Sequence, residues 1–318
     1  RVRVEGGRAT GVELLLDGHP ETALAGSEVI LAAGTINSPH LLLLSGIGPV
    51  GELARHGIDP VADAPEVGQN LLDHVACGLL CRTRDVRTLA RADTPLNLLR
   101  WLLAGGGPLA SNVAEGAAFV RSDPCLAAPD LELLFAPVLF ENEGLTRPTE
   151  HGLTLATILL QPRSRGTVRL ASSDPVAAPF IDPGYFTDEG GDDLRLMLHG
   201  LRLARRIAST RPLSDYIAGE SEPGAEARDD DALRAHIRRR SQTLYHPVGT
   251  CRAGTDARSV VDPQLRVRGV DCLRVVDASV FPRLPRGHPN WPVVAVAERA
   301  AELISRPASS SPPPDSRE

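Results

Sequence analysis

The fold of this chain is decided by the stretch SEVILAAGTINSPHLLLL, residues 27–44. Residues 27–33 form an apolar run of the kind found in strands that are buried on both faces. The run ends at Gly34-Thr35, and Asn37-Ser38-Pro39 follows. Asn or Ser caps a helix and proline suits its first turn, so a helix is predicted to begin here. The stretch therefore predicts a buried strand that passes directly into a helix.

The spacing of apolar residues predicts the elements on either side of this stretch. Strands are expected within residues 1–33, around Val2 and Val4, over 9–14 and over 27–33, and residues 153–160 and 167–170 are expected to pair as a hairpin. Helical spacing is clearest over 193–209, where the apolar positions are Leu194, Met197, Leu198, Leu201, Ala204 and Ala208. Further elements are predicted as helices over 51–56, 230–240 and 293–305, and as a strand over 273–276.

The composition is that of a folded chain. Of 318 residues, 42% are hydrophobic and 23% are charged. The apolar fraction is sufficient for a core, and the charged fraction is close to the average of globular proteins. The length predicts about two domains. The net charge is −6 and all 34 basic residues are arginines. They form no basic tract, which argues against a nucleic-acid partner because phosphate binding needs clustered cations.

The same survey argues against several other classes. No run approaches the roughly 18 apolar residues of a membrane span, and the carboxylates within residues 1–20 are unlike a signal peptide. Five irregularly spaced cysteines argue against a disulfide framework. Cys77 and Cys81 lack a second pair of zinc ligands, so no metal site is expected. We expect reduced thiols in a cytoplasmic protein, and because the chain starts at Arg1 we expect processing or a longer parent protein.

A formal G-x-G-x-x-G pattern occurs at residues 46–51. A dinucleotide site would need a strand before the pattern and a helix opening within it. Here a leucine-rich helix is predicted before the pattern, and Pro49 interrupts it. The pattern is therefore interpreted as the end of a helix, with a dinucleotide site as the alternative.

Longer segments are far more specific, and they occur in one order along the chain. AGTINSPHLLLLSGIGP at 33–49 and YHPVGTCR at 245–252 resemble the second signature and the catalytic histidine segment of the glucose–methanol–choline (GMC) oxidoreductases. Other matching segments are VGQNLLDH at 67–74, VDPQLRV at 261–267, LRVVDASVFP at 273–282, GHPNWP at 287–292 and AERA at 297–300. The chain is identified as a member of this family, nearest to its choline-dehydrogenase-like branch.

The resemblance implies FAD-dependent oxidation of a small-molecule alcohol. In that chemistry a side chain accepts the hydroxyl proton while a hydride passes from the adjacent carbon to the flavin, and histidine suits the task because its pKa is near neutral. His246 lies where the family's catalytic histidine belongs, and His288 lies at the partner position. We expect His246 to be the base, although the two roles could be exchanged. The alternatives are two ordinary loop histidines, or metal ligands together with Cys251.

The resemblance also places flavin contacts at three points. Gly34 and Thr35 end the buried strand, where close approach to a nucleotide is typical. Asp277 and Ala278 follow the second short strand, with a simple turn as the alternative role for the aspartate. Asn290 and Pro292 begin the last helix, whose N-terminal N–H groups would point at the flavin. Trp291 stands where the family usually has a small residue.

The resemblance implies an α/β fold with two parts. Residues 1–74 would form part of a Rossmann-like FAD-binding domain, which 251–306 would complete with the catalytic loops. Residues 75–250 would form an α+β substrate-binding domain with an antiparallel sheet and helices. Residues 307–318, rich in serine and proline, predict a disordered tail.

One part of the family pattern is missing. The Gly-rich strand–turn–helix that holds the ADP half of FAD is not found in the sequence. We therefore expect this chain alone to bind FAD poorly, with the N-terminal part of the enzyme absent or supplied separately. A non-catalytic fragment and a hydroxynitrile-lyase-like member are the alternatives. Oxygen, a quinone and a carrier protein are all open as electron acceptor.

Overall fold

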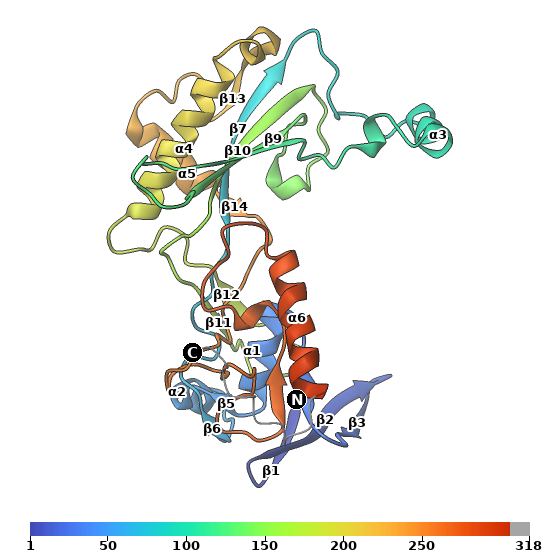
Figure 1. Cartoon of the computed structure of the whole chain (residues 1–318), viewed down its shortest axis with the longest axis vertical. Coiled ribbons are helices and arrows are strands. Elements are labelled where there is room, and N and C mark those ends of the chain that lie inside the picture. The colour runs from blue at the N-terminus through green and yellow to red at the C-terminus, as the bar shows by residue number, and fades with distance from the viewer. Residues whose placement is uncertain (306–318) are drawn as a thin grey trace, which may run out of the picture. The chain divides into compact units, whose positions relative to one another are not determined.

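The computed structural model describes residues 1–305, so the predicted tail at 307–318 lies outside the described residues. The chain forms two compact units (Figure 1). The first contains residues 1–72, 165–183 and the segment from Pro247 onward, and the second contains 73–164 and 184–246. The segment 165–183, which the sequence analysis assigned to the substrate-binding part, thus belongs to the same unit as the two end segments. Among the described residues, no helix has the length and apolarity needed to cross a bilayer.

Within the described residues, the first unit contains four small sheets. One is antiparallel, in the order β1 (Val2–Glu5), β2 (Arg8–Leu16) and β3 (His19–Leu24). The others are strand pairs: parallel β4 (Val29–Leu31) with β15 (Leu273–Val275), parallel β5 (Ile47–Gly48) with β6 (Ala62–Asp63), and antiparallel β11 (Thr167–Arg169) with β12 (Phe180–Asp182). Residues at the two ends of the sequence therefore meet in the β4–β15 pair.

Helices pack around these strands in the first unit. They are α1 (Gly34–Leu44), α2 (Val50–Arg55), the short 3-10 helix η4 (Ala278–Val280) and α6 (Asn290–Ser305). The core that joins them is aliphatic and includes Leu31, Leu42, Leu43, Ile47, Leu53, Val261, Val275 and Ala300. After α1 the chain turns at Gly46, whose φ of 79° is in the left-handed region. This confirms that the start of the G-x-G-x-x-G pattern ends a helix.

Two expectations about the deciding stretch were wrong in detail. The helix begins at Gly34 rather than at Asn37-Ser38, and Ser38 lies inside it, where its Oγ accepts the N–H of Ala33 at 3.1 Å. The strand β4 is buried on one face only, since Ile30 is 43% exposed between buried Val29 and Leu31. In the described part of the chain β4 belongs to a two-stranded sheet with β15.

The second unit is organised by one fully antiparallel sheet, as expected for the substrate-binding part. Its order is β13-β7-β10-β9-β8, and β14 also pairs with β7. The strands are β7 (Val75–Thr83), β8 (Gly116–Val120), β9 (Leu131–Ala136), β10 (Gly152–Leu159), β13 (Ile217–Glu222) and β14 (Gln242–Thr243). The sheet and the strand pairs of the first unit confirm the predicted mixed fold class.

Two helices of the second unit, α4 (Asp192–Ala208) and α5 (Asp230–Arg240), cover one face of this sheet (Figure 1). The unit also contains α3 (Pro95–Ala104) and three short 3-10 helices, η1 (Pro108–Ala110), η2 (Asn142–Gly144) and η3 (Leu213–Tyr216). The six apolar residues predicted to form one stripe of α4 are all buried. They pack against alternate residues of the central strands, including Cys77, Leu79, Cys81, Leu131, Leu133 and Leu155. Because side chains alternate across a strand, the remaining residues of β7 and β10 point to the opposite face.

The predicted hairpin of 153–160 with 167–170 was wrong. β10 pairs with β7 on one side and β9 on the other, so it has no free edge for β11, which pairs with β12 instead. The turn between them leads from one unit to the other. Asp193 fixes the end of this turn, because its carboxylate accepts the N–H groups of Arg163 and Ser164 at 2.8 and 2.9 Å.

Candidate active site

The first part of the candidate site is the carboxyl end of the parallel pair β4–β15. Leu31 lies opposite Val275, and the two strands continue to Gly34 and Asp277. Gly34 has a φ of 84°, and a Cβ added there would meet no atom within 4 Å. An open glycine at the carboxyl end of parallel strands allows a nucleotide to approach the backbone closely. These residues therefore fit the flavin contacts expected at this position.

Asp277 joins the two strand ends by hydrogen bonds. Its Oδ2 accepts the N–H of Gly34 at 3.0 Å and the hydroxyl of Ser38 at 2.5 Å, and its Oδ1 accepts the N–H of Ser279 at 2.8 Å. The carboxylate thus caps both α1 and η4, whose first residue is Ala278. The structure brings Gly34, Thr35, Asp277 and Ala278 together in one unit. The hydrogen bonds of Asp277 within the turn also agree with the alternative role, that of a turn aspartate.

Thr35 is held in this region through an irregularity of α1. Pro39 lies inside the helix, and because proline has no N–H, the carbonyl of Thr35 four residues earlier loses its helical donor. The hydroxyl of buried Thr250 donates to that carbonyl at 2.6 Å instead. The Thr35 hydroxyl in turn donates to the carbonyl of Pro247 at 2.7 Å. The sequence analysis did not single out Thr250, although a proline four residues after Thr35 was a signal that another donor was needed.

Replacing Thr250 with valine is expected to lower the free energy of unfolding by about 1–3 kcal/mol, because the buried carbonyl of Thr35 would lose its donor. Valine has nearly the same shape as threonine, so packing is preserved. Thr250→Ser retains the hydroxyl and serves as the matched control. Denaturant unfolding measures both variants; equal stability of Thr250→Val and Thr250→Ser would contradict this role.

The last helix begins at Asn290, as the resemblance implied, and three residues before the start that apolar spacing predicted. Asn290 is the first residue of α6 and Pro292 lies in its first turn, where a missing N–H costs least. His288 precedes the helix in an exposed loop, and Trp291 is 77% exposed. The N-terminal N–H groups of a helix attract partial negative charge, which is the property that the expected flavin contact requires.

His246, in the second unit, is anchored through its backbone by the buried carboxylate of Asp73. Asp73 Oδ1 accepts the N–H of His246 at 3.0 Å. Asp73 Oδ2 accepts two hydroxyls, those of Tyr185 and Thr243, each at 2.5 Å. The segment 243–246 is therefore tied around one carboxylate at several points.

The residue before His246 has an unusual backbone conformation. Tyr245 has a φ of 61°, in the left-handed region that residues other than glycine rarely adopt. Its N–H donates to the Thr243 hydroxyl at 2.8 Å, which holds this turn. Backbone strain of this kind persists where the surrounding contacts determine the conformation, and it concentrates at functional sites.

The ring of His246 meets a second histidine that the sequence analysis did not assign. His74 Nδ1 lies 3.0 Å from His246 Nδ1, and the two rings meet edge to face. His74 is fully buried, and its Nε2 donates to the carbonyl of Leu160 at 3.2 Å. The available signal was the Asp73-His74 pair at the end of the 67–74 segment, directly before the apolar run that forms β7.

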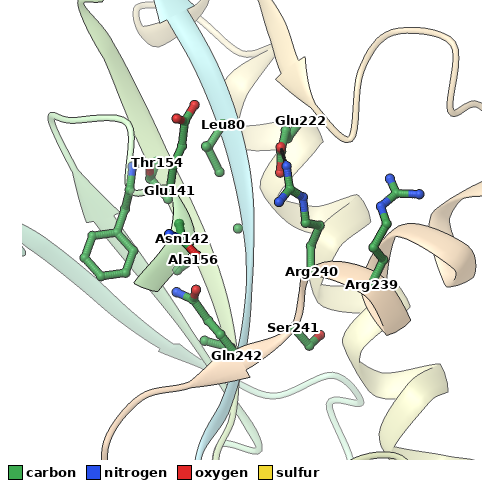
Figure 2. A pocket seen from close by; sticks show the side chains of 13 residues that line it. Leu80, Glu141, Asn142, Thr154, Ala156, Glu222, Arg239, Arg240, Ser241 and Gln242 are labelled. Atoms are coloured by element: carbon green, nitrogen blue, oxygen red, sulfur yellow. Dashed lines mark hydrogen bonds and ion pairs between the residues drawn. The ribbon is translucent and has the colours of Figure 1, made fainter. Parts of the chain in front are cut away.

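A cavity of about 150 Å³ lies on the sheet face opposite α4. Ala76, Gly78 and Leu80 of β7 and Thr154 and Ala156 of β10 form its floor, and charged or polar side chains surround it: Glu141, Asn142, Glu222, Arg239, Arg240, Ser241 and Gln242. Figure 2 shows Arg240 directed at Glu222, its ion-pair partner, whereas Arg239 points elsewhere. His74 precedes β7 and His246 follows β14 by three residues, so both flank the strands that line the cavity.

The buried cysteines of β7 are packing residues rather than reactive groups or metal ligands. Burial raises the pKa of Cys77 to about 12 and that of Cys81 to about 11, and both face the α4 side of the sheet. They are packing residues, since a thiol with so high a pKa is neither a nucleophile nor a metal ligand at neutral pH. Within residues 1–305, no three His, Cys, Asp or Glu side chains cluster as a metal site would require.

The structure thus divides the expected site residues between the two units. Gly34, Thr35, Asp277, Ala278, His288, Asn290 and Pro292 lie in the first unit, and His246 lies in the second. Fold and site together define a class of protein. One α/β unit offers open backbone to a nucleotide at the carboxyl ends of two parallel strands, and the same chain continues into a unit whose antiparallel sheet carries an anchored histidine.

Comparison with known families identifies the particular family. Two family models, both described as GMC oxidoreductase, match residues 1–76 and 162–297. The chain belongs to the GMC oxidoreductase family. This confirms the resemblance drawn from the motifs, and with it FAD as the family's cofactor.

Several curated relatives match nearly the whole chain. An uncharacterized GMC-type oxidoreductase of Mycobacterium tuberculosis is 50% identical over 305 residues, which cover 96% of this chain and 58% of that protein. The alcohol dehydrogenase [acceptor] of Pseudomonas putida and the oxygen-dependent choline dehydrogenase of Brucella ovis are each 40% identical over 313 residues, covering 96% of this chain and 56% of theirs. The chain therefore spans somewhat more than half the length of these relatives.

Solved structures give the same assignment. A formate oxidase variant of Aspergillus oryzae, from work on FAD modification, matches with a TM-score of 0.87 at 30% identity and covers 96% of this chain and 59% of that one. The pyridoxine 4-oxidase of Mesorbium loti matches with a TM-score of 0.82 at 29% identity, covering 95% and 55%. The fold class and the choline-dehydrogenase-like character are thereby confirmed.

Proposed function

We propose that this chain carries the histidine site of an FAD-dependent enzyme that oxidises a small alcohol. The observation that carries the proposal is the anchoring of His246: a buried carboxylate holds its backbone, and a second imidazole contacts its ring. A loop histidine without a function needs neither contact. A cavity of about 150 Å³ in the same unit, lined by strands that His74 and His246 flank along the chain, is large enough for a small molecule.

In this proposal His246 accepts the proton of the substrate hydroxyl. A histidine is effective in this role because its pKa lies near the working pH. His288 is its partner and stabilises the developing alkoxide through an N–H group. FAD, when bound, supplies the acceptor for the hydride that leaves the adjacent carbon. The second unit, residues 73–164 and 184–246, would then form the substrate-binding part, and the first unit the FAD-binding part.

The flavin-facing residues are proposed on the geometry of the first unit. Gly34 provides open backbone at a strand end, and Thr35 continues it into α1. Asp277 fixes the two strand ends to each other and presents the N–H of Ala278. Asn290 and Pro292 would offer the first turn of α6 to a flavin carbonyl, with favourable helix-dipole electrostatics.

In the enzyme completed with its N-terminal part and loaded with FAD, replacing Gly34 with valine is expected to remove most of the bound FAD. The side chain would occupy the open approach to the strand end, where a φ of 84° already disfavours it. Gly57 is the matched control, because it also has a positive φ and open space where a Cβ would lie, but it belongs to the turn after α2. The FAD-to-protein absorbance ratio measures the effect. Equal FAD loss in Gly34→Val and Gly57→Val would refute a specific contact.

Product analysis distinguishes the proposed oxidation from the other chemistry considered. An oxidase or dehydrogenase turns over alcohol continuously only when an external electron acceptor is present and otherwise stops after one aldehyde per flavin, whereas a hydroxynitrile lyase releases aldehyde continuously without an acceptor. We expect continuous aldehyde formation to require the acceptor. Aldehyde released from a cyanohydrin at the same rate without acceptor would overturn the assignment as an oxidoreductase acting on alcohols.

A further inference from the structure

The contact between His74 and His246 constrains where the protons lie on both rings. A neutral imidazole carries one N–H, so one ring nitrogen donates and the other accepts. A carbonyl oxygen only accepts, so the contact of His74 Nε2 with the Leu160 carbonyl at 3.2 Å places the proton of His74 on Nε2. Its Nδ1 is therefore an acceptor.

The second contact then fixes the state of His246. The two Nδ1 atoms are 3.0 Å apart, a hydrogen-bond distance that needs one proton between them. Since His74 Nδ1 is the acceptor, the proton belongs to His246 Nδ1. In a neutral His246 ring the remaining nitrogen, Nε2, then carries a lone pair rather than a proton.

From this geometry we propose that His74 is a positioning residue that holds His246 in the Nδ1–H tautomer, so that Nε2 is the proton-accepting atom. The proposal deepens the proposed function and rests on it for its catalytic meaning. A base must present its unprotonated nitrogen to the substrate hydroxyl, and a histidine in the wrong tautomer fails even when its position is right. The hydroxyl proton would move to His246 Nε2, while His246 keeps its Nδ1–H bonded to His74.

The tautomer assignment holds for a neutral His74, whose side chain is fully buried at the start of β7. The backbone also holds the two residues together, because the His74 carbonyl accepts the N–H of Leu244 at 2.9 Å. If His74 were doubly protonated, the hydrogen bond would reverse and His246 would carry its proton on Nε2 instead.

Histidine-selective ¹⁵N labelling tests the proposal, because long-range ¹H–¹⁵N correlations report which ring nitrogen is protonated. The spectra would be recorded well above the ordinary histidine pKa of about 6.5, and the His246 signals would be identified by their loss in His246→Gln. We expect His246 as the Nδ1–H tautomer and His74 as the Nε2–H tautomer. Finding the His246 proton on Nε2 in the unmodified protein would overturn the proposal without reference to any variant.

Two variants of His74 extend the test. His74→Phe keeps an aromatic ring but removes the acceptor, so His246 is expected to shift toward the Nε2–H tautomer and kcat to fall by about 10²-fold or more, with KM little changed. His74→Asn offers an amide oxygen as acceptor and is expected to restore the Nδ1–H signal. Exposed His199 on α4 provides the control variant His199→Gln. An unchanged His246 tautomer in His74→Phe would also refute the proposal.

The tautomer measurement does not depend on turnover. If the protein shows the expected tautomers but oxidises no alcohol, the positioning role of His74 stands and the proposed function is disproved. If the protein oxidises alcohols while His246 is in the Nε2–H tautomer, the proposed function stands and the positioning role of His74 is disproved.

Discussion

Replacing His246 with alanine in the FAD-loaded enzyme is expected to lower kcat for alcohol oxidation by about 10²–10⁴-fold, the usual contribution of a general base. The substitution removes the group proposed to accept the hydroxyl proton. It leaves the backbone N–H that Asp73 accepts, so the segment 243–246 keeps its anchor. KM is expected to change much less than kcat, because the loss falls on the transition state. Steady-state kinetics with a primary alcohol provide the measurement.

Two comparisons make this result specific. His199→Ala changes an exposed histidine of the same unit and is expected to retain full activity. His288→Ala tests the partner role, and it is expected to lower kcat less than His246→Ala does. A larger effect at His288 would exchange the two roles, whereas unchanged turnover in His246→Ala would remove His246 from the mechanism.

Replacing Asp73 with alanine is expected to lower the free energy of unfolding by about 3 kcal/mol or more. Three donors end on this buried carboxylate: the backbone N–H of His246 and the hydroxyls of Tyr185 and Thr243. Each donor left without an acceptor costs about 1–3 kcal/mol. Turnover is also expected to fall sharply, because the segment that carries His246 loses its anchor. Urea unfolding and kcat measure the two effects.

Variants that remove a single hydrogen bond provide the comparison. Tyr185→Phe and Thr243→Val each delete one hydroxyl and leave the carboxylate and the N–H of His246 in place. Each is expected to cost about 1 kcal/mol and to retain most of the activity. If Asp73→Ala were no less stable than Tyr185→Phe, the carboxylate would not be the anchor of the site.

The sequence predicted elements best where one helix face or one motif determined them. The stripe of α4 from Leu194 to Ala208 was correct because apolar residues at helical spacing pack on a sheet. The start of α1 was misplaced because its first turn is capped from Asp277, more than two hundred residues away along the chain. Local capping preferences carry no information on such a partner.

The strand errors have an equally physical origin. The segment 153–160 was correctly predicted as a strand, but its pairing depends on β7 and β9, which already occupy both of its edges. β7 itself was not predicted; its run VACGLL is buried on both faces and lacks the alternation that indicates a strand. In the candidate site, His246 was indicated by its motif, whereas the role of His74 depends on a contact across 172 residues of chain.

Anaerobic reduction of the flavin by alcohol tests the central claim most directly. In the enzyme completed with its N-terminal part and loaded with FAD, adding a small primary alcohol without oxygen is expected to bleach the flavin absorbance and yield one aldehyde per flavin. His246→Ala is expected to bleach about 10²–10⁴-fold more slowly. A flavin that stays oxidised with every alcohol in a broad panel, or that bleaches equally fast without the His246 imidazole, would contradict the account.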